Sequence, residues 1–347
     1  MGSRVTPVDD GGPVTTQPVA EVRPDAEVRS NAEVRPDAEV RPDAAVAAGA
    51  PPAHARGRSR HRGPLGPGAR RLALAAGAVV LAAGALAATT TAASDGGPDP
   101  SGVAMPTSDG DGWQRVFAED FAESTPRGAF EGDYSDRFSV YHGFADTAGT
   151  GRYQSSTLTA RDGMLDMRLR TTKGGTPLAG GIVPLVDGRW GGQTAGRYSI
   201  RMKSDEVDGY GVAVLLWSDA NLWSDGEVDF PEGALGAPAW LNVHCLVDPA
   251  EKCIHHETDA SLADWHTYTI EWTPTRMSFL VDDVVVGSTT ENIPTAMMHF
   301  VVQAGSLEGV PPRDAAGSLL VDWITIDVPA AGEAPQATLP SDGPVPG

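Results

Sequence analysis

The sequence predicts an all-β fold, an antiparallel sandwich or jelly roll, for the part of the 347-residue chain that begins near Trp113. From there on, short segments of β-branched or alternating apolar residues recur between turn signals, and no segment of useful length has a helical period. All eight Trp, six Tyr and eight Phe also lie at or beyond Trp113. A segment without aromatics, rich in Pro, Ala and charge, buries too little apolar surface to fold. The folded domain is therefore expected at residues 113–330.

The first part of the chain, residues 1–71, has the composition of a tail. Residues 20–43 contain four six-residue repeats of the AEVRPD type, and three of them carry a proline. Proline at this spacing excludes a helix, and one Val per repeat cannot build a solenoid core. We expect residues 1–71 to be a disordered tail of repeats and basic residues. Residues 331–347 are expected to be a second disordered tail.

An uncharged apolar run from Leu72 to Ala88 follows a cluster of arginines that ends at Arg71, and small residues continue it to Ala93. Its length is at the lower edge for a membrane-spanning helix. The preceding arginines predict that residues 72–93 anchor the chain with its N-terminus inside and the large domain outside. A cleavable signal peptide is the alternative, because small residues such as Ala87 suit a signal peptidase. Either outcome exports the domain, and residues 94–112 are expected to be a linker.

Strands are predicted at nine places within the domain. Among them, Val212–Trp217 is apolar on both faces, which predicts a central strand covered on both sides. The nine segments are Leu165–Leu169, Tyr198–Met202, Val212–Trp217, Glu227–Phe230, Tyr268–Trp272, Ser278–Val281, Val284–Val286, His299–Gln303 and Leu319–Ile326.

The strand that begins at Glu227 carries three acidic residues. Side chains at i and i+2 of a strand share a face, so Glu227 and Asp229 point the same way. Glu232 would face the opposite way on a regular strand, because it is an odd number of residues further along. A β-bulge adds one residue and restores the match, and Pro231 stands where a bulge tolerates a proline. The sequence therefore predicts three carboxylates on one face.

Close carboxylates repel one another, so at least one of them is kept protonated while another stays ionised. Hydrolysis of a glycosidic bond with retention needs such a pair, a nucleophile and an acid/base, about 5–5.5 Å apart. An exposed acidic edge strand and a calcium site are the alternatives for the same spacing.

The segment GEVDFPEG at residues 226–233 resembles the active-site motif of glycoside hydrolase family 16 in its bulged, laminarinase-like form. Further segments resemble this family in the same order, and the resemblance covers about residues 113–328. These segments are residues 196–203, 215–217, 265–274, 279–282 and 320–324.

The resemblance implies a concanavalin A-like β-sandwich jelly roll, with Glu227 as nucleophile, Asp229 as its helper and Glu232 as acid/base. Pro231 departs from the family, in which many relatives carry Met or another apolar residue at this position. The tract after Glu232 also lacks the glycine and tryptophan pattern of well-studied glucanases. These departures leave the chemistry intact but put the usual β-1,3-glucan substrate in question.

Aromatic side chains beside the carboxylates are the expected platforms for sugar rings, because pyranoses present apolar faces. Trp223 and Trp190 are the main candidates, and Trp217 either lines the cleft or belongs to the core. His244 is either a cleft residue, as the resemblance implies, or a buried histidine. Gln303 is a candidate for binding sugar hydroxyls. Trp240 and Trp272 are expected in the core.

Cys245 and Cys253 are the only cysteines. In an exported chain they favour a local disulfide that closes a hairpin, and two unpaired core thiols are the alternative. His255 and His256 follow closely. Neighbouring residues on a strand face opposite ways, so we expect these histidines in a loop near Cys253 rather than in a metal site.

The resemblance also implies a possible structural calcium ion on the convex side of the sandwich, held by a carboxylate of the last strand. Asp322 with Glu119 or Asp120 would supply the oxygen ligands. No cofactor is required for the reaction itself.

The net charge of −20 argues against a nucleic-acid partner, which needs a basic footprint. The expected function is that of a monomeric, retaining endo-β-glycan hydrolase, similar to β-1,3-glucanases, that acts on an extracellular polysaccharide. A transglycosylase using the same site and a non-catalytic glycan-binding module are the alternatives.

Overall fold

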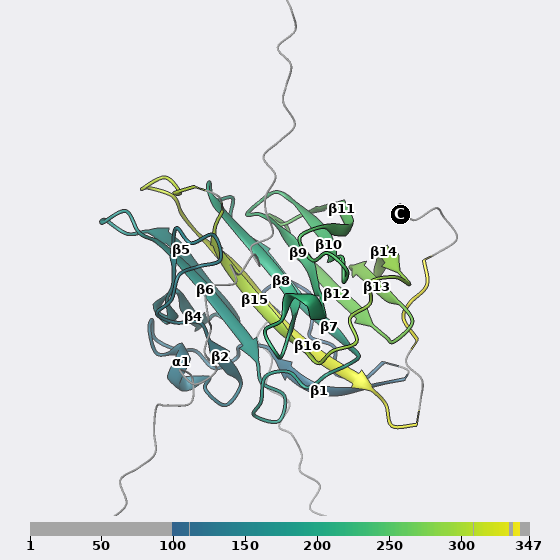
Figure 1. The fold of residues 1–347 in the computed structure, drawn as a ribbon. Helices are drawn as coiled ribbons and strands as arrows, with labels where there is room; N and C mark the ends of the chain where they lie inside the picture. Colours follow the sequence, from purple (N-terminus) through teal and green to yellow (C-terminus); the bar gives the residue numbers. More distant parts are fainter. Residues whose placement is uncertain (1–98, 111, 308, 333–335, 341–347) are drawn as a thin grey trace, which may run out of the picture.

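The structure is a computed structural model that describes residues 99–110, 112–307, 309–332 and 336–340. Its strands follow one continuous path that folds back on itself, giving a front and a back sheet (Figure 1). The front sheet has the order β11 (Lys252–Ser261), β10 (Pro238–His244), β9 (Glu227–Ala234), β8 (Tyr210–Ser218), β15 (Met298–Ser306) and β6 (Pro177–Pro184). The back sheet has the order β5 (Met164–Thr171), β16 (Ala316–Pro329), β7 (Gly196–Ser204), β12 (His266–Trp272), β13 (Met277–Val281) and β14 (Val284–Thr289).

The two sheets are joined where β5 pairs with β6, and short elements complete the fold. All strand pairs are antiparallel except β3 with β6. The short strands are β1 (Trp113–Glu119) on β16, β2 (Phe138–Val140) and β3 (Arg152–Tyr153) on β6, and β4 (Leu158–Arg161) on β5. The helical elements are α1 (Phe130–Asp133) and the 3₁₀ turns η2 (Ser155–Thr157) and η3 (Trp223–Asp225).

All nine segments predicted as strands lie within strands, so the all-β, antiparallel prediction is confirmed. Strand β8 is central, between β9 and β15, and every one of its residues is buried. Val212, Val214 and Leu216 face the back sheet and join the main core. The alternate residues of β8 face outward and form a separate apolar cluster with Val183 and Val301. This outer face of the front sheet carries the candidate site.

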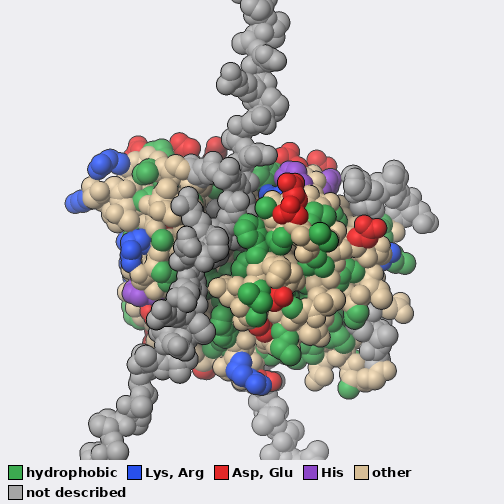
Figure 2. All heavy atoms as spheres, viewed as in Figure 1, with side chains coloured by type: hydrophobic (Ala, Val, Ile, Leu, Met, Phe, Trp, Pro, Cys, Tyr) green, Lys and Arg blue, Asp and Glu red, His purple; other side chains and the backbone are tan. Residues whose placement is uncertain are grey.

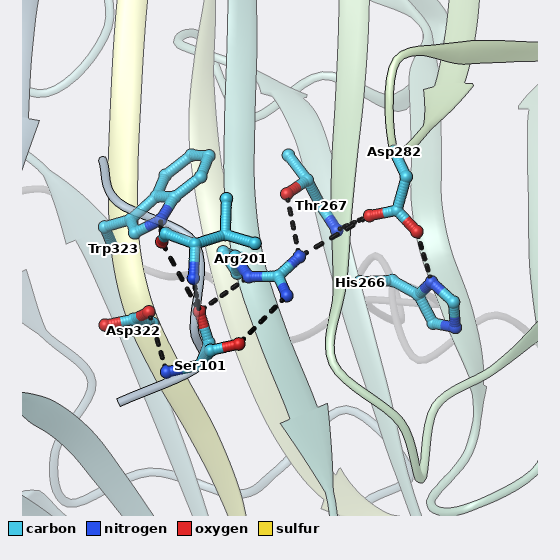
Figure 3. Close-up of polar contacts among 8 residues, drawn as sticks. Ser101, Arg201, His266, Thr267, Asp282, Asp322 and Trp323 are labelled. Carbon is cyan, nitrogen blue, oxygen red and sulfur yellow. Dashed lines mark hydrogen bonds and ion pairs between the residues drawn. The ribbon is translucent and has the colours of Figure 1, made fainter. Parts of the chain in front are cut away.

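The chain also contacts the back sheet outside residues 113–330. Ser101 donates its backbone N–H to Asp322 Oδ2 at 3.2 Å, and Arg201 Nε donates to Ser101 Oγ at 2.6 Å (Figure 3). Trp323 Nε1 donates to the Val103 carbonyl at 3.1 Å. Near the other end of the chain, Thr338 donates its backbone N–H to a carboxylate oxygen of Glu271 at 2.5 Å. These polar contacts use individual residues of β7, β12 and β16 rather than a repeating pattern. Sequence periodicity therefore does not predict them.

Residues 1–71 and 72–93, predicted as tail and as anchor or signal segment, lie outside the described residues. Within the ranges that the structure describes, no helix is long and apolar enough to cross a membrane.

Cys245 and Cys253 form a disulfide, as predicted. The bond closes the turn between β10 and β11, and the Cys245 N–H also donates to the Glu251 carbonyl at 2.9 Å within this turn. The two cysteines are separated by 8 positions. A cross-link over so short a loop removes about 2–3 kcal/mol of chain entropy from the unfolded state in the chain-entropy model.

Replacing both cysteines by serine (Cys245→Ser with Cys253→Ser) is therefore expected to lower the free energy of unfolding by about 2–3 kcal/mol. Urea unfolding of the oxidised wild type and the double variant measures this difference. Equal midpoints for the two proteins would show that the disulfide does not stabilise the fold.

Candidate active site

Three carboxylates lie on the outer face of the front sheet. In the pairing of β9 with β8, Glu227 stands opposite Trp217, Asp229 opposite Leu215, and the third carboxylate, Glu232, opposite Ala213. The three β8 partners belong to the outer apolar cluster, so the carboxylates share its face. All three acidic side chains are fully buried. Such a group of buried acids is unfavourable unless neighbouring groups compensate it.

The β-bulge predicted at Pro231 is present. Between Asp229 and Glu232 the register shifts against both neighbouring strands, β8 and β10, so β9 carries one residue more than each partner. The extra residue returns Glu232 to the face of Asp229, as the spacing predicts. The Phe230–Pro231 peptide is cis.

His244 on β10 compensates the charge of Asp229. Its Nε2 lies 3.6 Å from Asp229 Oδ2, and its Nδ1 lies 2.7 Å from the Pro249 carbonyl, to which it donates. Burial lowers the pKa of His244, but the Asp229 carboxylate and the Pro249 carbonyl outweigh it, so the pKa is raised above its ordinary value. His244 is thus a buried residue of the site.

Glu227, Asp229 and His244 also form a group that could hold a metal ion, because one ligand atom from each lies within 4.8 Å of the others. Two carboxylates and an imidazole suit a divalent ion chemically. The same atoms are those that acid/base chemistry would use.

Asn242 and His255 are further members of the site that the sequence did not reveal. Asn242 is buried and pairs with Asp229 on one side and with His255 on the other. Its Nδ2 donates to Glu232 Oε2, and its Oδ1 lies 2.7 Å from His255 Nδ1. His255 and His256 lie on strand β11, so the prediction that they lie in a loop is wrong. Exposed and half-buried residues alternate along this edge strand, and most of them are polar. The apolar/polar alternation that predicts a strand is therefore missing from β11.

The predicted tryptophan platforms gather at one end of the face. Trp217 is nearly buried, and its Nε1 donates to Asn221 Oδ1 at 2.9 Å. Trp223 packs beside His244, with ring centroids 6.1 Å apart. Trp190 is 43% exposed and meets the buried His299 edge to face at 4.4 Å. Trp190 is therefore the predicted platform most open to a sugar ring.

Gln303 lies at the other end of the face, among aromatic residues that sequence reasoning missed. Tyr153 donates its hydroxyl to Gln303 Oε1 at 2.7 Å. Tyr141 lies directly over Gly181 of β6, where an added Cβ would come within 2.5 Å of its ring. Tyr141 and Tyr153 pack edge to face at 5.1 Å, and Phe144 completes the group. Residues 177–184 are not among the strands that the sequence predicts, so this platform is not expected from the sequence.

Trp272 is buried in the core, as expected, but Trp240 is not. Trp240 stands opposite Glu232 on the outer face, and its Nε1 donates to Glu257 Oε2 at 2.9 Å. The alternation of β10 decides this, because Trp240, Asn242 and His244 share one face.

The structure does not bring Glu119 and Asp322, two of the possible calcium ligands, together. Glu119 accepts from the Phe121 N–H at 2.8 Å and pairs with Arg137 at 3.2 Å. It stands opposite Ile324, a core residue, whereas Asp322 faces Ser101 on the outer side of the back sheet (Figure 3). A register shift between Val321 and Trp323 turns Asp322 to that side. Burial raises the pKa of both carboxyls, Glu119 and Asp322.

The chain is similar to known proteins in sequence and fold. Glycosyl hydrolases family 16 matches residues 192–325. The fold is similar to an endo-1,3-β-glucanase from Streptomyces sioyaensis, at 19% identity and a TM-score of 0.51, covering 64% of this chain and 99% of that chain. It is also similar to a laminarinase from Flavobacterium sp. UMI-01, at 15% identity and a TM-score of 0.51, covering 61% and 99%. No curated protein matches the chain.

The raised pKa of His244 has a consequence for stability. A raised folded pKa contributes stability that is fully present below the unfolded value, about 6.5, and is lost as the pH rises through the folded pKa. His244→Gln removes this contribution. The difference in free energy of unfolding between wild type and variant is therefore expected to be larger at about pH 5.5 than at about pH 9. Urea unfolding at both pH values measures it, and equal differences would contradict the charge pairing with Asp229.

Proposed function

We propose that this protein cleaves a β-1,3-linked glucan, or a closely related β-glycan, at bonds inside the glycan chain. It contains a glycoside hydrolase family 16 domain, and this is a family of retaining endo-glycanases. The observation that carries the proposal is the bulge at Pro231, which puts Glu227, Asp229 and Glu232 on one face. A regular strand would leave Glu232 on the core side, where no substrate reaches it.

In the proposed first step, the Glu227 carboxylate attacks the anomeric carbon while protonated Glu232 gives its proton to the glycosidic oxygen. The bond from the anomeric carbon to that oxygen breaks, the shortened glycan leaves as an alcohol, and a glycosyl ester forms on Glu227. In the second step, Glu232 takes a proton from water, the water oxygen bonds to the anomeric carbon, and Glu227 is released as a carboxylate. Two inversions retain the anomeric configuration.

Asp229 and His244 are proposed to form a charge pair that stays in place beside the reacting carboxylates during these steps. Asp229 lies between the two catalytic carboxylates along β9, and the His244 ring lies 3.6 Å from it. The raised pKa of His244 favours its charged form, which offsets the negative charge of Asp229, and that negative charge disfavours a second one nearby. This repulsion favours the protonated form of an acid that must donate a proton.

Support for a β-1,3-glucan comes from the solved structures of similar fold, among which are a laminarinase and an endo-1,3-β-glucanase. The aromatic residues at both ends of the outer face support a long glycan that crosses the sheet. Trp190 lies at one end, and the Tyr141–Phe144 pair lies at the other. An endo-acting enzyme binds sugar units on both sides of the cleaved bond, so platforms on both sides suit this mode of action.

We also propose that the enzyme works outside the cytoplasm. The Cys245–Cys253 disulfide supports an oxidising compartment. The order of arginines and apolar residues in 56–93 supports export. Protease digestion of intact and of permeabilised cells would test this, because an exported domain is cut in both.

The roles of the two catalytic carboxylates are tested with alanine variants and azide. Glu232→Ala is expected to lower kcat/KM on laminarin by about 10²–10⁴-fold, because general acid catalysis is lost. Glu227→Ala removes the nucleophile and is expected to leave no measurable hydrolysis. Azide should then restore turnover of an activated aryl glycoside. The product is a glycosyl azide of retained configuration with Glu232→Ala and of inverted configuration with Glu227→Ala.

Glu291→Gln serves as the matched control, since Glu291 is exposed in a turn after β14 and should leave activity unchanged. Product analysis on a panel of β-glucans, galactans and bacterial exopolysaccharides identifies the glycan. Tight binding without turnover, unchanged in Glu227→Gln, would replace the hydrolase with a glycan-binding module.

A further inference from the structure

A continuous line of hydrogen bonds leads from Glu232 to the edge of the front sheet. Asn242 Nδ2 donates to Glu232 Oε2, and Asn242 Oδ1 lies 2.7 Å from His255 Nδ1. The three residues stand side by side on the outer face, on β9, β10 and β11. Asn242 and Glu232 are fully buried, whereas His255 is at the solvent-facing edge. One amide therefore connects the buried acid to a histidine at the rim.

The direction of these hydrogen bonds follows from the orientation of the Asn242 amide, whose Nδ2 faces Glu232. A carboxamide has one donor end and one acceptor end, and a carboxylate oxygen accepts. If Asn242 donates to Glu232, its Oδ1 must accept from His255, so the His255 proton sits on Nδ1. Burial, with Lys252 and His256 nearby, lowers the pKa of His255 against the opposing effect of Glu257. The neutral Nδ1–H ring and the charged ring both donate from Nδ1.

The surroundings of His255 hold its ring in place. Trp240 meets the ring edge to face at 5.4 Å, and Trp240 itself is held by its hydrogen bond to Glu257 at 2.9 Å. In the space-filling view, histidine and acidic side chains gather near the corner formed by β10 and β11 (Figure 2). From the neighbouring strand β10, the indole of Trp240 and the amide of Asn242 face His255. The charged groups near His255 come from β11 itself.

We propose that His255 is a positioning residue for the acid/base Glu232, acting through Asn242. By donating to Asn242 Oδ1, His255 keeps the amide nitrogen turned toward Glu232 Oε2, so that the proton of Glu232 is carried on Oε1. If the amide turned over, Asn242 Oδ1 would accept the Glu232 proton and hold it away from the glycosidic oxygen. The proposal rests on the proposed role of Glu232, and it extends the acid/base machinery to a residue on the edge strand.

The kinetic test compares His255→Ala, His255→Asn and His256→Ala in the full-length protein. The amide nitrogen of Asn is bonded to Cγ, as Nδ1 is, so His255→Asn keeps the donor. His256 lies on the other side of β11 and is the matched control. Two substrates are used: laminarin, or the glycan that the panel identifies, and the 2,4-dinitrophenyl β-glycoside of its disaccharide. Dinitrophenolate leaves without protonation, so its release needs little help from Glu232.

His255→Ala is expected to lower kcat/KM on the glycan by about 10-fold and on the aryl glycoside by less than about 3-fold, because only proton donation is impaired. His255→Asn should recover most of the activity on the glycan, and His256→Ala should change neither substrate. The ratio of the two losses does not depend on the folded fraction. Equal losses on both substrates, or no recovery with His255→Asn, would overturn the proposal.

A second measurement does not require activity. Long-range ¹H–¹⁵N correlation spectra of the ¹⁵N-histidine-labelled protein report which ring nitrogen carries the proton, and the signals of His255 are those absent in His255→Ala. We expect the Nδ1–H form near neutral pH, and an Nε2–H form would overturn the proposal. If the wild type cleaves no glycan while His255 is in the Nδ1–H form, the proposed function fails and the hydrogen-bond line stands.

Discussion

The candidate site depends on one extra residue in β9. Strand β9 is bonded on both sides, and the register shifts against β8 and against β10 at the same place, between Asp229 and Glu232. A bulge at a sheet edge would affect one partner only. Here two neighbouring strands accommodate it, and so the positions of Asn242 and Trp240 opposite Asp229 and Glu232 follow from it. Without the extra residue, Glu232 would enter the core between the sheets.

This constraint also explains why the site is rich in polar partners that are themselves buried. A buried carboxylate is tolerated only with compensating donors or charges. Two of the carboxylates have different partners: His244 faces Asp229, and Asn242 donates to Glu232. Both partners come from β10, two residues apart, and are in turn held by the Pro249 carbonyl and by His255. The β10–β11 hairpin is thus the support of the acidic strand.

Much of the architecture could be predicted because it depends on local patterns. Strand β8 reads as apolar on both faces because two layers cover it, and Pro231 marks the bulge because it has no N–H to donate. The partners of the acids could not be predicted. Asn242 and His255 become neighbours only through strand pairing, and β11 alternates between polar exposed and half-buried residues. The separation of Glu119 from Asp322 could not be predicted for a similar reason, since a register shift in β16 decides the side to which Asp322 points.

The disulfide that closes the β10–β11 hairpin lies next to these partners. Cys245 directly follows His244, and the turn that it closes contains Pro249, whose carbonyl holds the His244 ring. Cys253 lies two residues before His255 on the other strand of the hairpin. The geometry of both histidines is therefore tied to the oxidation of two thiols. The hairpin that supports the acidic strand is therefore cross-linked only where thiols are oxidised, so assembly of the site depends on the redox state of its surroundings.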